Sequence, residues 1–302
     1  MGIVVIGATF VDIKGFPLEV YIPTGRNAGT IEYIHGGVSR NVAEDIANIG
    51  LNPTFISIVD ESALGQDVIH RLNNHNVNTK YIQSIPNGMG TWLAVFDENG
   101  DVAGSISQRP NLMPILDLLQ NQGDKIISQC DSIILEADID IEIIELVFNL
   151  ANKYHKSVYP IVSNMSLVLE RKQYIPQFAC FICNQQEAGM LFNEDYENKT
   201  PEQLCEIIKD KTSTPLVVTM GAQGAVYVDQ NKESGIYPAH KVQVLDTTGA
   251  GDAFCAGVVS GLTYGKPLSE AVKIGTTLAA SVIVSSENVC PRFSHEEFVI
   301  DL

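Results

Sequence analysis

The chain contains 302 residues, of which 45% are hydrophobic, and its formal net charge is −17 at pH 7. That length and apolar content allow one large α/β domain or two ordinary domains, and they exclude a disordered chain. The excess of acidic residues argues against nucleic acid or an anionic membrane as a main partner, because both are bound through clustered Lys and Arg.

The N-terminus and the cysteines indicate the compartment. No run approaches the roughly 18 apolar residues that span a bilayer, and Met1–Ile6 enters a strand without a basic leader segment. The six cysteines lack the spacings of a disulfide framework. We therefore expect a cytoplasmic protein.

Only Cys180 and Cys183 invite a zinc interpretation, and in a strand an offset of three points them to opposite faces.

The first predicted strand is Ile3–Ile6, which breaks at Gly7 and resumes through Phe10–Asp12. Open α/β sheets bind their ligands just beyond the ends of their strands, so Asp12 is a candidate ligand-binding carboxylate. A turn acid is the alternative interpretation. Residues 13–35 place Gly and Pro between short β-prone runs, a pattern that disfavours a helix and suits a lid.

The stretch from Gly36 to Gly50 predicts a helix, because an apolar stripe precedes a terminal glycine. Its glycine pair, Gly36 and Gly37, lets a ligand approach the backbone. Asn41 offers both a donor and an acceptor to a polyol. Arg40 is suited to a substrate anion or carbonyl, and a solvated surface arginine is an equally good interpretation.

Strands are expected next at Thr54–Val59, Thr91–Phe96 and Val102–Ser107. The last two flank Asn99-Gly100, which is a strong hairpin signal between alternating strands.

From residue 131 onward strands alternate with helices, which predicts an α/β fold whose parallel sheet carries helices on both faces. The expected strands are Ser132–Leu135, Ser157–Val162, Phe178–Cys183 and Leu216–Thr219, and the expected helices cover 140–154 and begin at 201. No linker or composition shift divides the chain, so one domain over 1–302 is expected.

Two short segments follow strands in this half, Asn184–Glu187 and Thr219–Gly224. A single glutamate such as Glu187 suits Mg²⁺, which prefers few carboxylates together with water and phosphate oxygens. An ordinary first-turn helix acid is the alternative. The glycines of the second segment also suit a plain hairpin turn.

The run Val242–Leu245 predicts a strand that breaks into a glycine turn and feeds a small-residue helix. Glycines at 249 and 251 let main-chain N–H groups converge at the helix start, where the helix dipole favours an anion. The amides of 249–252 therefore form a predicted anion cradle.

Asp252 lies inside this cradle, where a carboxylate repels a phosphate unless it has a chemical task. The task we expect is to accept a proton from a hydroxyl that attacks the terminal phosphate of a nucleotide. A helix cap is the alternative.

A P-loop is excluded, because no G-x-x-x-x-G-K-[ST] occurs, and Phe254 stands where a dinucleotide fingerprint needs its third glycine.

Two of these segments resemble the signatures of the PfkB, or ribokinase-like, family of carbohydrate and nucleoside kinases. Asp246–Asp252 has the form D-T-x-G-A-G-D, and Gly36–Ala43 precedes it by roughly 200 residues, as the family's first signature does. The resemblance covers essentially the whole chain. It implies a three-layer α/β/α sandwich with a mostly parallel central sheet and a small β lid from about 12–35 and 88–110.

The resemblance also implies a role for each candidate residue. Asp252 would be the base, and the anion hole would comprise Gly249, Ala250 and Gly251. The phosphoryl acceptor would be held by Asp12, Gly36, Gly37, Arg40 and Asn41. ATP would contact Asn184, Thr219, Gly221, Gly224 and Thr277, while Glu187 would place Mg²⁺ through water.

Two further implications concern ions and assembly. Asp246 and Thr248 match the family's monovalent-cation loop, but Ser285-Ser286 stands where many members carry Gly-Ala, so a requirement for K⁺ stays open. The exposed lid often serves as a dimer interface in this family, so a homodimer through the lid is one expected arrangement.

The predicted activity is transfer of the γ-phosphate of Mg·ATP to a primary hydroxyl. Gly36–Ala43, followed by Glu44 and Ile49-Gly50, looks most like pseudouridine kinases, which points to the 5′-hydroxyl of pseudouridine. A sugar kinase of the ribose or fructose type is the first alternative. A non-catalytic nucleoside sensor is the second, and the retention of Asp252 with both glycines weighs against it.

Overall fold

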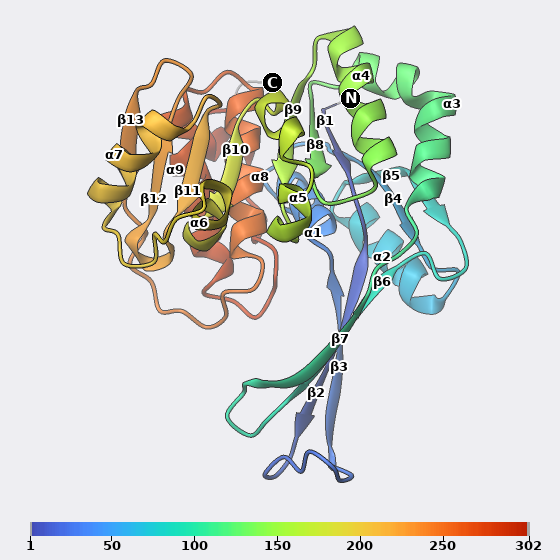
Figure 1. Ribbon diagram of the computed structural model, residues 1–302. Helices are drawn as coiled ribbons and strands as arrows, with labels where there is room; N and C mark the ends of the chain where they lie inside the picture. The colour runs from blue at the N-terminus through green and yellow to red at the C-terminus, as the bar shows by residue number, and fades with distance from the viewer. Residues whose placement is uncertain (1, 301–302) are drawn as a thin grey trace.

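The computed structural model describes residues 2–300, in which helices cover both faces of a central sheet (Figure 1). The parallel half of that sheet has the order β5-β4-β1-β8-β9. The strand bounds are Ile3–Ile6 for β1, Thr54–Val59 for β4, Asn78–Ser84 for β5, Ser132–Glu136 for β8 and Ser157–Ile161 for β9. Strands β1, β4 and β8 are buried along their whole length, as strands covered on both faces must be.

A second group of strands continues the sheet beyond β9, in the order β10-β11-β12-β13. The two groups meet where the Ala179 N–H donates to the Val158 carbonyl at 2.8 Å. The pair β10–β11 is parallel, and β12 and β13 are antiparallel additions at the edge. The bounds are Phe181–Asn184 for β10, Leu216–Thr219 for β11, Ala225–Val228 for β12 and Ser234–Tyr237 for β13.

The helices divide into two layers. One face of the sheet carries α1 (Val38–Asn48), α2 (Ala63–Asn74), α8 (Ala250–Thr263) and α9 (Leu268–Val282). The other carries α3 (Met113–Gln129), α4 (Ile141–Tyr154), α5 (Met165–Leu169), α6 (Gln185–Phe192) and α7 (Pro201–Lys211). Short 3₁₀ turns cover Lys172–Gln177, Gly221–Gln223 and His295–Phe298.

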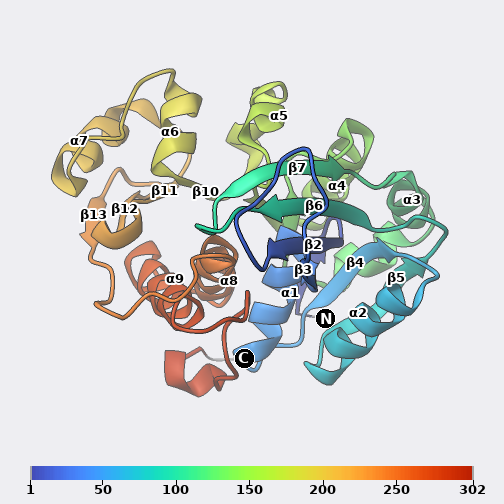
Figure 2. The same ribbon diagram turned by 90° about the horizontal axis from the view of Figure 1, so that it is seen from below.

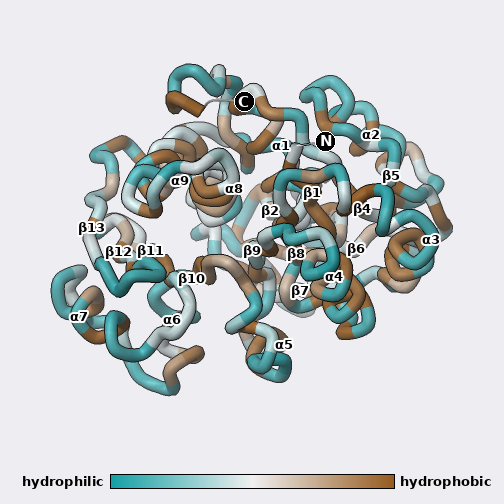
Figure 3. The backbone as a smooth tube through the Cα atoms, turned by 90° about the horizontal axis from the view of Figure 1, so that it is seen from above, coloured by the Kyte–Doolittle hydropathy of each residue, from teal (hydrophilic) through white to brown (hydrophobic). Residues whose placement is uncertain are grey.

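The alternation of side chains along β1 produces two hydrophobic cores. Ile3 and Val5 enter the core beneath α1 and α8, while Val4 and Ile6 enter the core beneath α3 and α4. Figure 3 shows the hydrophobic segments gathered in the central strands, with hydrophilic residues along the outer turns. The predicted three-layer α/β/α architecture is confirmed. Within residues 2–300 no helix is both long and apolar enough to cross a bilayer.

A separate four-stranded sheet, which we call the lid sheet, projects from the body with the strand order β3-β2-β6-β7 (Figures 1 and 2). Its strands are β2 (Phe10–Pro17), β3 (Gly29–Gly36), β6 (Gly90–Phe96) and β7 (Val102–Gln108). It begins directly after β1, so the base of the lid sheet stands at the carboxyl edge of the parallel strands. That edge is where open α/β sheets bind ligands.

Two predicted strands differ from the structure. Val242–Leu245 has no regular structure, and Leu245 is 68% exposed. A strand needs a neighbour for its N–H and C=O groups, and the one such bond here runs from the Leu245 N–H to the Ile283 carbonyl. The strand expected over Phe178–Cys183 begins only at Phe181. Cys180 and Cys183 enter opposite cores, so the expectation that they face apart is confirmed.

Candidate active site

The predicted base lies beside the predicted acceptor residue Asn41. The Asn41 Nδ2 donates to the Asp252 Oδ2 at 2.7 Å, which joins the first turn of α1 to the first turn of α8. Two segments 211 residues apart in sequence thus meet at one point. The other amide atom, Asn41 Oδ1, is buried and has no partner within residues 2–300, so this amide can accept one further hydrogen bond.

Burial raises the pKa of the Asp252 carboxyl to about 7, against the lowering effects of the Asn41 hydrogen bond and the Arg40 charge. A base works best when its pKa lies near the operating pH, because it is then both deprotonated and basic. The Asp252 carboxyl is therefore tuned to accept a proton near neutrality. A carboxyl that only capped a helix would not need this environment.

The turn before α8 leaves backbone N–H groups free. Gly249 has a φ of +81°, and a Cβ there would lie 2.0 Å from the Asn288 carbonyl oxygen, so only glycine fits. The Ala250 N–H donates to the Thr247 carbonyl at 3.2 Å. The amide of Ala250 is therefore already bonded within the turn, and its place in the anion hole stays a prediction. Within residues 2–300 the amides of Gly249, Gly251 and Asp252 have no acceptor.

Asp12 and the glycine pair form a second wall of the site. A Cβ at Gly36 would lie 2.8 Å from the Asp12 Oδ1, and a Cβ at Gly37, whose φ is +95°, would lie 2.9 Å from the Ala8 carbonyl oxygen. Burial raises the pKa of Asp12, while the charges of Lys14 and Arg40 oppose this. The lid sheet thus presents the Asp12 carboxyl against the glycine loop that precedes α1.

The burial of Arg40 excludes one of its two sequence interpretations. Its side chain is only 1% exposed, so it is not a solvated surface arginine. Its Nη1 donates to Glu44 at 2.6 Å, and its Nη2 donates to the His35 carbonyl, with Asn288 Oδ1 at 3.5 Å. Both terminal nitrogens bond inside the protein, while the buried Nε has no partner within residues 2–300, so the predicted contact of Arg40 with the acceptor stays a prediction. Arg40 joins the glycine loop after His35 to the Asn288 segment that packs on Gly249.

A cleft of about 1110 Å³ leads away from α8. Its lining includes four residues singled out from the sequence, namely Asn184, Thr219, Gly221 and Gly251. Asn184 and Thr219 are the last residues of β10 and β11, Gly221 lies just after β11, and Gly251 lies in the first turn of α8. Because Gly251 precedes Asp252, the candidate base stands at one end of a cleft large enough for an extended ligand.

Gly224 and Thr277 are not among the described residues that line this cleft. Gly224, with a φ of +98°, closes the turn after β11, and its carbonyl accepts from the Met220 N–H at 2.7 Å. Thr277 lies on α9, where its Oγ1 donates to the Lys273 carbonyl at 3.0 Å and lies 3.3 Å from His240 Nε2. Their contact with ATP stays a prediction.

Asn184 and Glu187 form a reciprocal cap on α6. The Glu187 N–H donates to Asn184 Oδ1 and the Asn184 N–H donates to Glu187 Oε2, both at 2.8 Å. Burial raises the pKa of Glu187, the Asn184 N–H lowers it and the charge of Asp138 raises it further. The first-turn interpretation is therefore correct. It leaves the second carboxylate oxygen of Glu187 for a water of a hydrated Mg²⁺, so this acid also fits the predicted metal role.

Asp246 and Thr248 bond to each other, since the Thr248 N–H and Oγ1 donate to Asp246 Oδ1 at 2.9 and 2.8 Å. The Thr248 N–H is the largest of the effects that lower the pKa of Asp246. This bonding shapes the turn that precedes the amides of the predicted anion hole. A role in binding a monovalent cation stays a prediction.

The sequence interpretation missed an acidic group at the end of β8. Glu136 accepts from the Ala8 N–H at 2.9 Å and from Ser39 Oγ at 2.8 Å. Asp138 accepts from the Ser163 N–H and Oγ and from Arg109, which follows β7 of the lid sheet. A signal was available, because Glu136 ends the buried strand β8 and Asp138 lies two residues beyond it. Arg109 gave no local signal, because its partners are distant in sequence.

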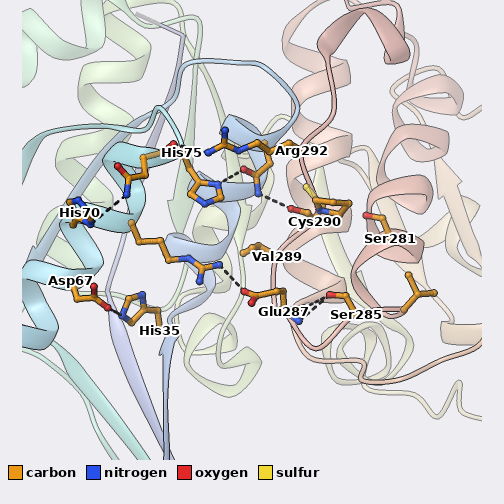
Figure 4. A pocket seen from close by; sticks show the side chains of 15 residues that line it. His35, Asp67, His70, His75, Ser281, Ser285, Glu287, Val289, Cys290 and Arg292 are labelled. Atoms are coloured by element: carbon orange, nitrogen blue, oxygen red, sulfur yellow. Dashed lines mark hydrogen bonds and ion pairs between the residues drawn. The ribbon is translucent and has the colours of Figure 1, made fainter.

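A further pocket of about 740 Å³ lies among α2, the end of α9 and the C-terminal segment (Figure 4). In it His35 pairs with Asp67 at 3.1 Å, and Arg71 joins the buried Glu44 to Glu287 at 2.9 and 2.8 Å. Burial lowers the pKa of His35 and of His75. The described lining contains none of the predicted catalytic or nucleotide residues, so this pocket is distinct from the cleft at Asp252.

Comparisons with known proteins fit this geometry. The chain is 34% identical over 291 residues to the guanosine-inosine kinase of Exiguobacterium acetylicum, covering 95% of each chain. It is 26% identical over 275 residues to the pseudouridine kinase of Escherichia coli strain K12, covering 90% of this chain and 87% of that one. The structure of Arabidopsis thaliana ribokinase complexed with ribose and ATP has a TM-score of 0.81 at 18% identity, covering 98% and 97%.

The model of the pfkB family carbohydrate kinases matches residues 2–291. The family expected from the two signature segments is therefore confirmed. Enzymes of this family transfer a phosphoryl group to a hydroxyl of a sugar or nucleoside. The chain has the α8 turn, the paired Asp252 and Asn41 and the adjoining cleft. It belongs to the pfkB family of carbohydrate kinases.

Proposed function

We propose that this protein is an ATP-dependent nucleoside kinase that phosphorylates the 5′-hydroxyl of a purine nucleoside of the guanosine–inosine type. The observation that carries the proposal is the Asp252 carboxyl, held by Asn41 at 2.7 Å beside the unpaired amides of the α8 turn. A base and an anion hole at adjacent residues are what in-line phosphoryl transfer to a hydroxyl requires.

In the proposed reaction Asp252 accepts the proton of the 5′-hydroxyl as its oxygen attacks the γ-phosphate. The amides of Gly249, Gly251 and Asp252 stabilise the charge on the transferring group, assisted by the positive end of α8. Asp12, which lies against the glycine loop, would hold the ribose hydroxyls. Asn41 keeps the carboxylate oriented and offers its unpaired Oδ1 to the acceptor.

The cleft beyond Gly251 would hold the triphosphate, with Asn184, Thr219 and Gly221 along its wall. When bound, Mg²⁺ would neutralise the phosphate oxygens, and Glu187 would hold one of its waters. Asp246 and Thr248 are the residues that would face a monovalent cation. Six buried, unpaired cysteines suit the cytosol as the working compartment.

The choice of acceptor rests on the comparisons. The relative that phosphorylates guanosine and inosine is 34% identical across 95% of the chain, against 26% for the pseudouridine kinase. Pseudouridine remains the second candidate, because Gly36–Ala43 resembles the corresponding segment of pseudouridine kinases. Phosphorylation of ribose or fructose would need the same base and anion hole, so both sugars are included in the assay.

A coupled assay of ADP release with guanosine, inosine, adenosine, pseudouridine, ribose and fructose tests the proposal. We expect turnover with guanosine or inosine at the highest kcat/KM. Turnover with pseudouridine alone would identify pseudouridine, in place of a purine nucleoside, as the acceptor. Turnover with ribose or fructose alone would make the protein a sugar kinase. Saturable nucleoside binding without ADP release would indicate a sensor and would contradict the proposed activity.

We also propose that two copies of the chain pair through the lid sheet. Strand register aligns Tyr33, Ile13, Leu93 and Ile106 in one row on the same face. Of these, Tyr33 is 57% exposed and Ile106 is 71% exposed. The opposite face carries Asp12. An exposed apolar row of this kind fits a second copy of the same row.

A further inference from the structure

A small cavity of about 190 Å³ adjoins the acceptor residues on the side of α4 and α5. Gly37 packs against two residues that line it, because a Cβ there would lie 2.9 Å from the Ala8 carbonyl oxygen and 3.0 Å from the Phe10 nitrogen. Whole ligand sites measure about 300–1,000 Å³. This volume therefore suits one end of a ligand whose other end lies at Gly37 and Asp252.

The cavity combines an apolar wall with charged side chains of both signs. Phe10, Leu112, Ile139 and Leu167 supply the apolar surface, Arg109 and Arg171 are cationic, and Glu136, Asp138 and Asp140 are acidic. A planar, polar ring system meets both conditions, because its faces are apolar and its edge carries hydrogen-bonding atoms. In a nucleoside kinase the planar part of the acceptor is the base.

The two arginines are held differently. Arg109 bonds to the wall of the cavity: its Nη1 donates to the Asp138 carbonyl, and its Nη2 donates to the Asp138 carboxylate and to Ser163. Arg171 donates through Nη1 to the Ile139 carbonyl, which fixes its guanidinium. Within residues 2–300 its Nε and Nη2 have no partner. That edge of Arg171 is a fork of two parallel donors.

A fork of two donors needs two adjacent acceptors. A 6-oxopurine presents O6 and N7 side by side, the pair that arginine recognises bidentately. Adenine presents an amino donor beside N7, and a uracil ring presents O4 without a neighbouring acceptor. Neither can accept both bonds.

We propose that Arg171 determines the base specificity of this enzyme by donating to O6 and N7 of a 6-oxopurine that lies in this cavity against Phe10. Asp140 follows Ile139 and lines the same cavity, and its side chain forms no cap bond on α4. Its carboxylate accepts the ring N1–H, which 6-oxopurines carry and adenine lacks. The inference rests on the proposed nucleoside kinase function and adds the residues that select the base.

The test compares kcat/KM for inosine and adenosine in the wild type, Arg171→Gln and Arg171→Lys. A glutamine amide pairs bidentately with adenine N6 and N7. We therefore expect Arg171→Gln to lower the inosine-to-adenosine ratio by about 10- to 100-fold, mainly through KM. Arg171→Lys keeps the charge and loses the fork, so inosine should weaken while adenosine does not improve. Lys172→Gln, the adjacent exposed position, is the matched control and should leave the ratio unchanged.

Calorimetric binding of inosine and adenosine to the same variants separates the two proposals. If no nucleoside is phosphorylated but inosine binding still depends on Arg171, the kinase proposal fails and the base site stands. Equal losses for both nucleosides in Arg171→Gln, or an unchanged ratio in both variants, would overturn the base site. A wild-type preference for adenosine or pseudouridine over inosine would overturn it as well.

Discussion

At the residue scale, the Asp252 environment predicts how activity depends on pH. Burial raises the pKa of this carboxyl to about 7, and only the deprotonated form can accept the proton of the attacking hydroxyl. We expect kcat/KM at saturating Mg·ATP to rise with pH through a midpoint near 7 and then level off. A profile that is flat between about pH 5.5 and 8.5 would contradict a rate-determining role for this base.

Asn41 provides a second prediction about the same carboxyl. Its hydrogen bond lowers the pKa of Asp252, so Asn41→Ala should raise that pKa and move the activity midpoint to higher pH. The acceptor KM should increase about 10-fold, while the KM for ATP changes by less than about 2-fold. Asn48→Ala, an amide in the last turn of α1, is the control for damage to the helix. Parallel losses for acceptor and ATP with an unmoved midpoint would assign Asn41 to the fold.

The sequence predicts this residue-scale chemistry only in part. The motif around Asp252 and the glycine pair before α1 are local, so their roles follow from short segments. The contacts of Arg40 join positions up to 248 residues apart, and no local pattern distinguishes a buried arginine from a surface one. The acids after β8 were missed for a different reason, because a single acid at a strand end is too common to be specific.

At the element scale, α1 depends on a buried ion pair. The Arg40 and Glu44 side chains are 1% and 0% exposed and lie 2.6 Å apart. Burial raises the pKa of Glu44, but Arg40 and Arg71 outweigh it, so the pKa lies below its ordinary value and Glu44 is charged. Removing Glu44 leaves the Arg40 charge buried without its partner, which costs about 3–5 kcal/mol. Removing Arg40 leaves Glu44 paired with Arg71 at 2.9 Å, so that loss should be smaller.

We therefore expect Glu44→Leu to destabilise the protein by about 3–5 kcal/mol in urea unfolding and Arg40→Met by less, whereas the double variant loses less than the sum of the two. The double variant should still have a reduced kcat, because Arg40 also holds the His35 carbonyl and Asn288 on either side of the active site. Additive losses of stability would show that the pair is not coupled. A wild-type kcat in the double variant would remove the positioning role.

The element scale also shows why one strand was predicted wrongly. Thr54–Val59 and Leu216–Thr219 were predicted with the bounds that the structure has, because apolar runs of this length enter the sheet between partners. Val242–Leu245 has the same kind of composition but lies beyond β13 without a strand to pair with. Composition reports the tendency to form a strand, and the sheet determines whether a partner exists.

At the scale of the whole molecule, the lid sheet predicts the state of assembly. Its apolar row should be covered in a dimer, so Ile106→Asp should yield monomers in light scattering coupled to size exclusion, while the wild type elutes as a dimer. Thr30→Asp changes a position in register with Phe16, on the opposite face, and should leave the dimer intact. A monomeric wild type would contradict the proposed pairing, and a dimeric Ile106→Asp would place the interface elsewhere.

The molecule as a whole brings three chemical parts to one edge of a parallel sheet. In the proposed reaction the α8 turn supplies the anion hole, α1 and the lid sheet supply the acceptor wall, and the cleft at β10 and β11 supplies the nucleotide wall. Alternation of strands and helices predicted that edge from the sequence. Which residues share it, such as Asn41 with Asp252, followed only from the fold.

The measurement that tests this account most directly is the turnover of Asp252→Asn, with the binding of ATP and inosine determined calorimetrically on the same preparation. The amide cannot accept a proton but can still accept the Asn41 hydrogen bond. The account predicts that kcat falls by about 100-fold or more while both dissociation constants stay within about 3-fold. A kcat close to that of the wild type, with binding intact, would contradict the assignment of Asp252 as the base.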